Sequence, residues 1–116
     1  MKHIKQADLK FNPRFVYKKH IYFGEEELGK GGKLQIIKFP PNTSLEAHFH
    51  KKTREVYYVI SGTCIVTVNE KPVELEQGDV LFLDINDSHQ LTTGKKEFIF
   101  LVWKTGEEET DIYWKK

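Results

Sequence analysis

The 116-residue chain has a single cysteine, Cys64, and nearly balanced charge, with 18 basic and 17 acidic side chains. One cysteine excludes an internal disulfide and agrees with a reducing compartment. A net charge of +1 provides no field that would attract a polyanion, so we expect no nucleic-acid partner. The apolar runs are too short for a membrane-spanning helix or a signal peptide. We therefore expect a cytoplasmic protein with no membrane partner.

Segments long enough for helices are also missing. Turn-forming Gly, Pro, Asn and Asp residues divide the chain into pieces of about four to eight residues. The pieces rich in β-branched and aromatic residues are predicted as strands: 34–39, 56–60, 64–68, 80–83 and 98–103, with a further pair at 15–17 and 21–24. Many short strands with frequent turns predict a single all-β domain, a sandwich or barrel with little helix.

Histidine is scarce, with five copies, and three of them are suggestively placed. His48 and His50 flank Phe49, so an extended backbone puts both imidazoles on one face. Glu55 opens the next strand, and His89 follows the turn at residues 86–88. These four side chains can meet only if the sheet rolls up into a barrel. Three nitrogens and one oxygen would suit a divalent transition metal ion (Fe, Mn, Ni, Zn or Cu) better than Ca²⁺ or Mg²⁺.

A single histidine is more often a surface or core residue than a metal ligand. The combined spacing, with His, Glu and Gly at 2, 7 and 14 residues after His48, is poorly explained by chance in a chain of this composition. The spacing resembles the first motif of the cupin superfamily, which runs from HxH through Glu to Gly. His48, His50, Glu55 and Gly62 match that motif, whereas its leading glycine is replaced by the turn at 41–43.

The second cupin motif is matched at Gly78 and His89. It departs at three positions: Asp84 stands for the proline, Asn86 for the second glycine and Thr93 for the asparagine. Asn tolerates the left-handed backbone that glycine would supply, so we expect the turn at Asn86 to persist. Asp84 is expected either to be solvated or to lie at the rim of the pocket.

The resemblance implies a small single-domain cupin, a jelly-roll-like barrel that binds a metal through His48, His50, Glu55 and His89. Residues 33–103 would form the conserved barrel. Residues 1–32 would supply strands that cover the barrel or make a dimer interface, and residues 104–116 would be a C-terminal extension. We expect a homodimer, and Cys64 is interpreted as a small buried hydrophobe or a thiol for a redox crosslink.

Members of the family catalyse many reactions, so the fold leaves the function open. Our first hypothesis is a metal-dependent enzyme, of the dioxygenase or isomerase/cyclase type, acting on a small oxygenated substrate chelated at the metal. Tyr57, on the face of Glu55, is a candidate hydrogen-bond donor to substrate, and the competing interpretation is a core aromatic. The alternative function is a non-catalytic small-molecule binding or sensor module with a structural or ligand-holding metal. A barrel without metal is a third.

Overall fold

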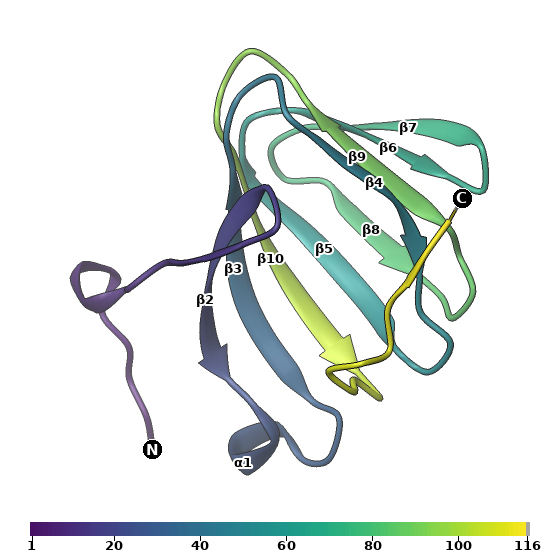
Figure 1. Cartoon of the computed structure of the whole chain (residues 1–116). Coiled ribbons are helices and arrows are strands. Elements are labelled where there is room, and N and C mark those ends of the chain that lie inside the picture. Colours follow the sequence, from purple (N-terminus) through teal and green to yellow (C-terminus); the bar gives the residue numbers. More distant parts are fainter. Residues whose placement is uncertain (116) are drawn as a thin grey trace.

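The computed structural model describes residues 1–115 and contains two antiparallel sheets that face each other (Figure 1). The six-stranded sheet is ordered β1 (Asn12–Arg14), β2 (Tyr17–Phe23), β3 (Lys33–Phe39), β10 (Phe98–Thr105), β5 (Arg54–Ser61) and β8 (Val80–Leu83). The five-stranded sheet is ordered β11 (Tyr113–Trp114), β4 (Ser44–Phe49), β9 (His89–Thr93), β6 (Cys64–Val68) and β7 (Lys71–Leu75). Helix is limited in the described residues to the 3-10 turn η1 (Gln6–Asp8) and α1 (Glu25–Leu28). The predicted all-β, jelly-roll-like fold with little helix is confirmed.

The core lies between the two sheets, and strand alternation explains its composition. In β9 buried and exposed residues alternate strictly, with His89, Leu91 and Thr93 buried. The six-stranded sheet contributes apolar side chains to the same interior: Ile37, Phe39, Tyr57, Val59, Phe98, Phe100 and Val102. Cys64 belongs to this cluster at 2% exposed. Burial raises the pKa of its thiol to about 12, which agrees with its interpretation as a small buried hydrophobe.

Both N-terminal strands are placed differently than predicted, and the second is longer. Residues 15 and 16 form the turn between β1 and β2, where Phe15 has a φ of 50°. β2 then continues through residues 18–20, which the prediction left between two strands, because Lys18 to Ile21 pair with β3. The polar Lys18 and Lys19 therefore lie in β2, the second strand from the edge of the sheet. The assignment of 15–17 as a strand was wrong at Phe15 and Val16.

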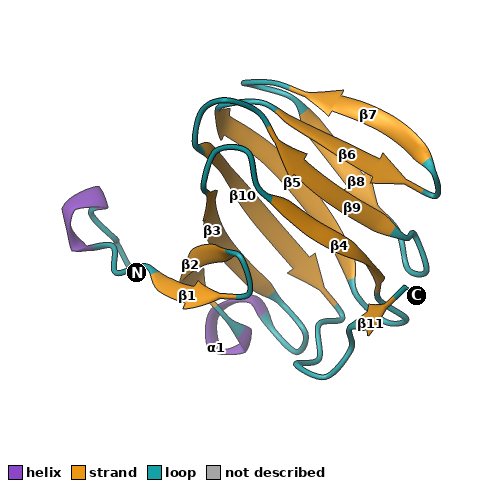
Figure 2. Cartoon of the chain, turned by 45° about the horizontal axis from the view of Figure 1, so that its top comes forward, coloured by secondary structure: helices purple, strands orange, loops and turns teal. Residues whose placement is uncertain are grey.

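The C-terminal segment crosses from one sheet to the other. After β10 the chain turns, and β11 pairs with β4 at the edge of the five-stranded sheet (Figure 2). Tyr113 stacks on Phe49, and the Trp114 ring lies 5.1 Å from that of His48. This segment therefore closes over the end of the barrel that carries the histidines. Within residues 1–115 no helix is long and apolar enough to cross a membrane.

Candidate metal site

Three histidines meet inside the barrel. His48 lies near the end of β4 and pairs directly with His89, the first residue of β9, and His50 follows β4. Each can offer a ring nitrogen, and these nitrogens all lie within 4.8 Å of one another. The three side chains are buried, at 5%, 8% and 1% exposed for His48, His50 and His89. Phe49, between the first two, points the other way and stacks on Tyr113.

The hydrogen bonds of these histidines fix which nitrogen is available. In each ring Nδ1 contacts a backbone carbonyl: that of Glu46 for His48, of Asp111 for His50 and of Asp87 for His89. A carbonyl oxygen can only accept, so each Nδ1 carries the proton and donates it. The Nε2 lone pairs of His48 and His89 are therefore available for another partner. Backbone contacts of this kind orient histidine ligands in metal proteins.

Glu55 enters from the facing sheet. Its Oε1 lies 2.7 Å from Nε2 of His50, and both side chains are buried. Burial raises the pKa of Glu55, but the positive charge of Lys104 and the contact with His50 lower it by a larger amount. The pKa of Glu55 is therefore below its ordinary value. Burial lowers the pKa of His50, whereas the Glu55 carboxylate raises it, and the net pKa rises. This pair can share either a proton or a cation between Nε2 and Oε1.

The residues present fit a bound divalent metal ion. Nε2 of His89 is buried and has no hydrogen-bond partner among the described residues. A buried nitrogen without a partner is unfavourable unless a hydrogen-bond donor or a metal ion binds its lone pair. Burial, and next the neighbouring His89, lowers the pKa of His48 to about 4. Burial likewise lowers the pKa of His89. Both are neutral at pH 7, and neutral imidazoles beside an ionised carboxylate form a donor set that transition metals prefer.

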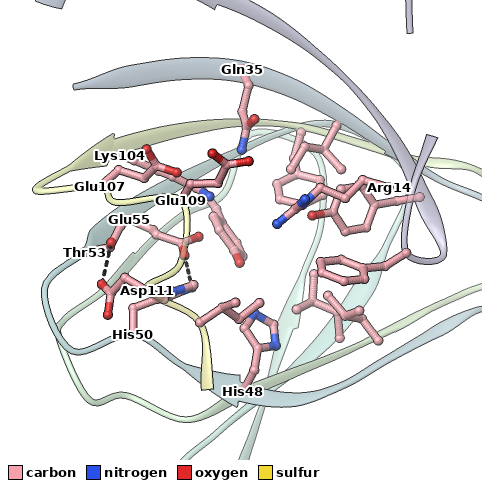
Figure 3. Close-up of a pocket in the computed structure, with 18 of the residues that line it drawn as sticks. Arg14, Gln35, His48, His50, Thr53, Glu55, Lys104, Glu107, Glu109 and Asp111 are labelled. Atoms are coloured by element: carbon pink, nitrogen blue, oxygen red, sulfur yellow. Dashed lines mark hydrogen bonds and ion pairs between the residues drawn. The ribbon is translucent and has the colours of Figure 1, made fainter. Parts of the chain in front are cut away.

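A pocket of about 60 Å³ lies beside three of these four residues, His48, His50 and Glu55 (Figure 3). Apolar and aromatic side chains form most of its far wall: Tyr17, Ile37, Phe39, Leu45, Tyr57, Leu91 and Phe100. Tyr57 is 4% exposed, and its ring lies 4.8 Å from that of Phe100. Burial, and next the Glu55 carboxylate, raises the pKa of Tyr57 well above its ordinary value. Its hydroxyl is therefore protonated and can donate a hydrogen bond.

Four pocket residues were not found by sequence reasoning. Lys104 is the cross-strand neighbour of Glu55, and Arg14 reaches the pocket from the end of β1. Their positions follow from strand pairing, which no local pattern reveals. Asp111 comes from the C-terminal segment. Gln35 could have been suspected, because it is a polar residue inside an apolar strand segment.

The departures from the cupin motifs are accommodated locally. Asn42, at the place of the leading glycine, and Asn86 both have positive φ, at 51° and 67°. Asp84 is exposed and accepts a hydrogen bond from Nε of Arg54 at 2.9 Å. Gly62 matches the motif and must be glycine, because its φ is +84° and a Cβ there would lie 2.3 Å from the carbonyl oxygen of Glu97.

The chain matches a known protein family. Residues 35–104 match the family model described as "Cupin domain". The chain belongs to the cupin family. Among curated cupin relatives, an oxalate-binding protein from Thermotoga maritima is 32% identical over 83 residues, which are 71% of this chain and 69% of that protein. The tetracenomycin polyketide synthase protein TcmJ from Streptomyces glaucescens is 32% identical over 60 residues, 52% of this chain and 40% of TcmJ.

Solved cupin structures share the fold at low sequence identity. A crystal structure described as a predicted oxalate decarboxylase from Thermotoga maritima superposes with a TM-score of 0.84 at 21% identity, covering 91% of this chain and all of that one. The polyketide cyclase RemF from Streptomyces resistomycificus gives a TM-score of 0.83 at 21% identity, covering 98% of this chain and 84% of RemF. At this identity the likeness establishes the fold alone.

Proposed function

We propose that this cupin is a metal-dependent enzyme of the dioxygenase or isomerase/cyclase type. It acts on a small oxygenated substrate chelated at a divalent transition metal ion. The observation that carries the proposal is the convergence of three histidine side chains in the barrel, beside an ionised Glu55. His48, His50, Glu55 and His89 would hold the ion. When bound, the ion would supply Lewis acidity toward a carbonyl or hydroxyl oxygen of the substrate.

The chain's own residues would orient the substrate and exclude water. The aromatic wall formed by Tyr17, Phe39 and Phe100 leaves little room for solvent beside the substrate. The protonated Tyr57 hydroxyl, close to Glu55, would donate a hydrogen bond to a substrate oxygen. Lys104 would place positive charge on the same side of the pocket. These groups give the site a donor and a cation besides the metal ligands, as expected for an enzyme.

The pocket size favours a small substrate. A volume of about 60 Å³ holds roughly four to six non-hydrogen atoms, at about 10 to 15 Å³ for each water-sized occupant. A small acid such as the oxalate named for the Thermotoga maritima relative is of this size.

The alternative is a non-catalytic module that binds or senses a small molecule at the same metal. One observation favours it: the relative from Thermotoga maritima is described as a binding protein rather than an enzyme. Both functions need the same four ligands, so ligand mutations alone do not separate them. Consumption of a bound substrate does.

The test has two stages. Protein purified without an affinity tag is first analysed for metal, and we expect close to one transition metal ion per chain, lost in His89→Ala and retained in His20→Ala, whose ring contacts Lys10 outside the pocket. Metal-loaded protein is then incubated with small keto acids, hydroxy acids and diketones under Fe(II), Mn(II) or Ni(II), and substrate loss is followed by NMR. Turnover that disappears in His50→Ala supports the enzyme. Saturable binding without consumption supports the binding module, and wild-type protein without metal under all loading conditions rejects both.

The cytoplasmic location, the homodimer and the division at residues 32 and 103 stay predictions. A dimer is supported by exposed apolar side chains on the outer face of the six-stranded sheet, namely Tyr58, Val80, Phe82 and Trp103. Because the net charge is only +1, a second copy could cover that face without strong overall charge repulsion.

A further inference from the structure

Two cationic side chains line the pocket and have no role in holding the metal. Arg14, at the end of β1, and Lys104, on β10, both line it. Among residues 1–115 neither forms an ion pair with a carboxylate. Arg14 instead lies over the ring of Phe15, with its guanidinium carbon 4.6 Å from the centroid. Against the effect of burial, the charge of Lys104 also lowers the pKa of Glu55, but neither cation has a carboxylate at ion-pair distance in the described chain, so both are suited to bind one from a ligand.

Glu55 is the cross-strand neighbour of Lys104, and its carboxylate is held by Nε2 of His50 at 2.7 Å. Most other acidic residues around the pocket also have partners of their own. Glu107 pairs with Lys33 at 3.0 Å, and Glu108 pairs with Lys52 at 3.1 Å. The Asp111 carboxylate accepts hydrogen bonds from residues 51–53. Glu109 has no such partner in the described chain but is exposed at the rim, where water screens its charge.

Gln35 adds a neutral polar contact to the same region. Its side chain is 1% exposed, and its Oε1 has no hydrogen-bond partner among the described residues. Figure 3 shows the Gln35 carboxamide pointing into the pocket, with the Arg14 guanidinium entering from one side. A buried amide oxygen without a donor is unfavourable, so the Oε1 of Gln35 would accept from a ligand hydroxyl or water, whereas a ligand carboxylate would accept from its Nε2. A polar group at this position, in a strand with Ile37 and Phe39 on the same face, is therefore typical of a ligand contact.

The cations on this side of the barrel are close enough to affect one another. Burial, and next the charges of Lys33, Arg14 and Lys104, lowers the pKa of Lys19 to about 8. Several cations therefore act on this part of the barrel, and the divalent ion held by the histidines would add positive charge. An anion placed here would relieve the repulsion.

We propose that the substrate is a small carboxylate anion, whose carboxylate is bound by Arg14 and Lys104 and accepts a hydrogen bond from the side-chain Nε2 of Gln35. This inference rests on the proposed function, in which another oxygen of the same molecule is held at the metal. The pocket volume restricts the acid to roughly four to six non-hydrogen atoms, which includes glycolate, pyruvate and oxalate. Arg14, Lys104 and Gln35 are then the residues that select an acid over its uncharged amide.

The experiment compares acids with their amides on full-length, Mn²⁺-loaded protein. Isothermal titration with glycolate and glycolamide, and with pyruvate and pyruvamide, gives the dissociation constants. We expect each acid to bind at least tenfold more tightly than its amide. Arg14→Gln and Lys104→Gln should each raise the Kd of the acids roughly 10- to 100-fold, because a charge-assisted hydrogen bond is lost, while the Kd of the amides changes less than threefold. Arg54→Gln is the matched control, because Arg54 is exposed and pairs with Asp84.

Gln35 is tested by Gln35→Met, which keeps the length of the side chain. A ligand contact predicts about tenfold weaker binding of acids with an unchanged or higher unfolding midpoint, because an unpaired buried group is removed. A lower midpoint with unchanged binding would show a structural role and remove Gln35 from the proposal.

Equal affinities for acids and amides, or acid affinities unaffected by both charge variants, would overturn the inference while leaving the metal site in place. Loss of metal binding in the wild-type protein would instead reject the proposed function. In that case the same titrations on metal-free protein, with and without Arg14→Gln, still decide whether the pocket selects an anion.

Discussion

Nδ1 of His50 donates a hydrogen bond to the backbone carbonyl of Asp111, 61 residues later in the chain. The Asp111 side chain strengthens this link, because its carboxylate accepts hydrogen bonds from the backbone amides of Lys51 and Lys52 and from the Thr53 hydroxyl. The C-terminal segment thus holds the loop that carries one candidate metal ligand. Asp111 lies beyond residues 35–104, the part that matches the cupin family model.

Asp111→Ala should therefore weaken both the fold and the metal site. Two backbone amides and a buried hydroxyl would lose their acceptor, which we expect to lower the free energy of unfolding by about 2 to 4 kcal/mol. The orientation of His50 would relax, and the Kd for Mn²⁺ or Zn²⁺ should rise roughly 10- to 100-fold. Urea titration and competition with a chromogenic chelator measure the two effects. Asp111→Asn keeps one acceptor and should lie between the wild type and the alanine variant.

The control for this prediction is Asp79→Ala, in the turn before β8, where the carboxylate accepts a single bond from the amide of Glu76. That variant should lose about 1 kcal/mol of stability and bind metal as the wild type does. Unchanged metal affinity in Asp111→Ala, despite lower stability, would show that the C-terminal segment does not position His50.

Asn86 tests the departure from the second cupin motif. Its φ of 67° lies in the left-handed region, and its backbone N–H donates a hydrogen bond to the backbone carbonyl of His50 at 2.7 Å. Asn86→Gly should leave stability unchanged within about 0.5 kcal/mol, whereas Asn86→Ala should cost about 1 kcal/mol because a Cβ disfavours this backbone. Thermal unfolding of the two variants measures the difference. Equal unfolding midpoints for both would contradict the argument that left-handed backbone explains asparagine here.

Strands β3, β5, β6, β8 and β10 were predictable because each is a segment rich in β-branched and aromatic residues that lies between turns, and side chains alternate between the two faces of a strand. The same alternation indicated which side of its strand each of His48, Glu55 and His89 occupies. The part of β2 at residues 18–20 was missed because Lys18, Lys19 and His20 are polar, and a strand near the edge of a sheet carries polar residues without a local signal. Pairing with β3, a long-range property, decides their structure.

The pocket was predictable in part. Residues inside a motif, such as His50, can be identified from their spacing in the sequence. Lys104 and Arg14 reach the pocket only because β10 pairs with β5 and because the hairpin of β1 and β2 extends the sheet beyond β3. Asp111 acts through its carboxylate and through a backbone carbonyl, and a carbonyl contact leaves no trace in side-chain identity. Strand order, rather than composition, therefore separates what was found from what was missed.

The outer face of the six-stranded sheet gives a prediction about assembly. Phe82 is 54% exposed and Trp103 is 53% exposed. The two residues lie on either side of Val56, which pairs with both. If a second copy covers this face, Phe82→Lys should place an uncompensated charge in the interface. Light scattering should then change from twice the chain mass to 13.6 kDa. Val16→Lys, in the turn between β1 and β2, should stay dimeric, and a monomeric wild-type protein would refute the interface.

Lys19 provides a pH dependence that does not involve the metal ligands. Its pKa is lowered to about 8, first by burial and then by the charges of Lys33, Arg14 and Lys104, against the weaker opposite effect of Glu107. In the unfolded chain the pKa of lysine is about 10.4. The folded state therefore disfavours the protonated amine, a cost that is fully present below pH 8 and declines as the pH rises from 8 toward 10.4.

Replacing the lysine should reveal this cost as a difference between two pH values. Lys19→Met should be more stable than the wild type at pH 7, and the advantage should shrink at pH 9.5, because the wild-type amine is then mostly neutral in the folded state. Urea midpoints of both proteins at the two pH values measure the change, and comparison within one pH cancels the titration of other groups. Lys18→Met, at the exposed neighbouring position, should show no such dependence. An advantage for Lys19→Met that grows with pH would mean that the Lys19 ammonium has a favourable anionic partner, in which case the cations around the pocket do not repel one another.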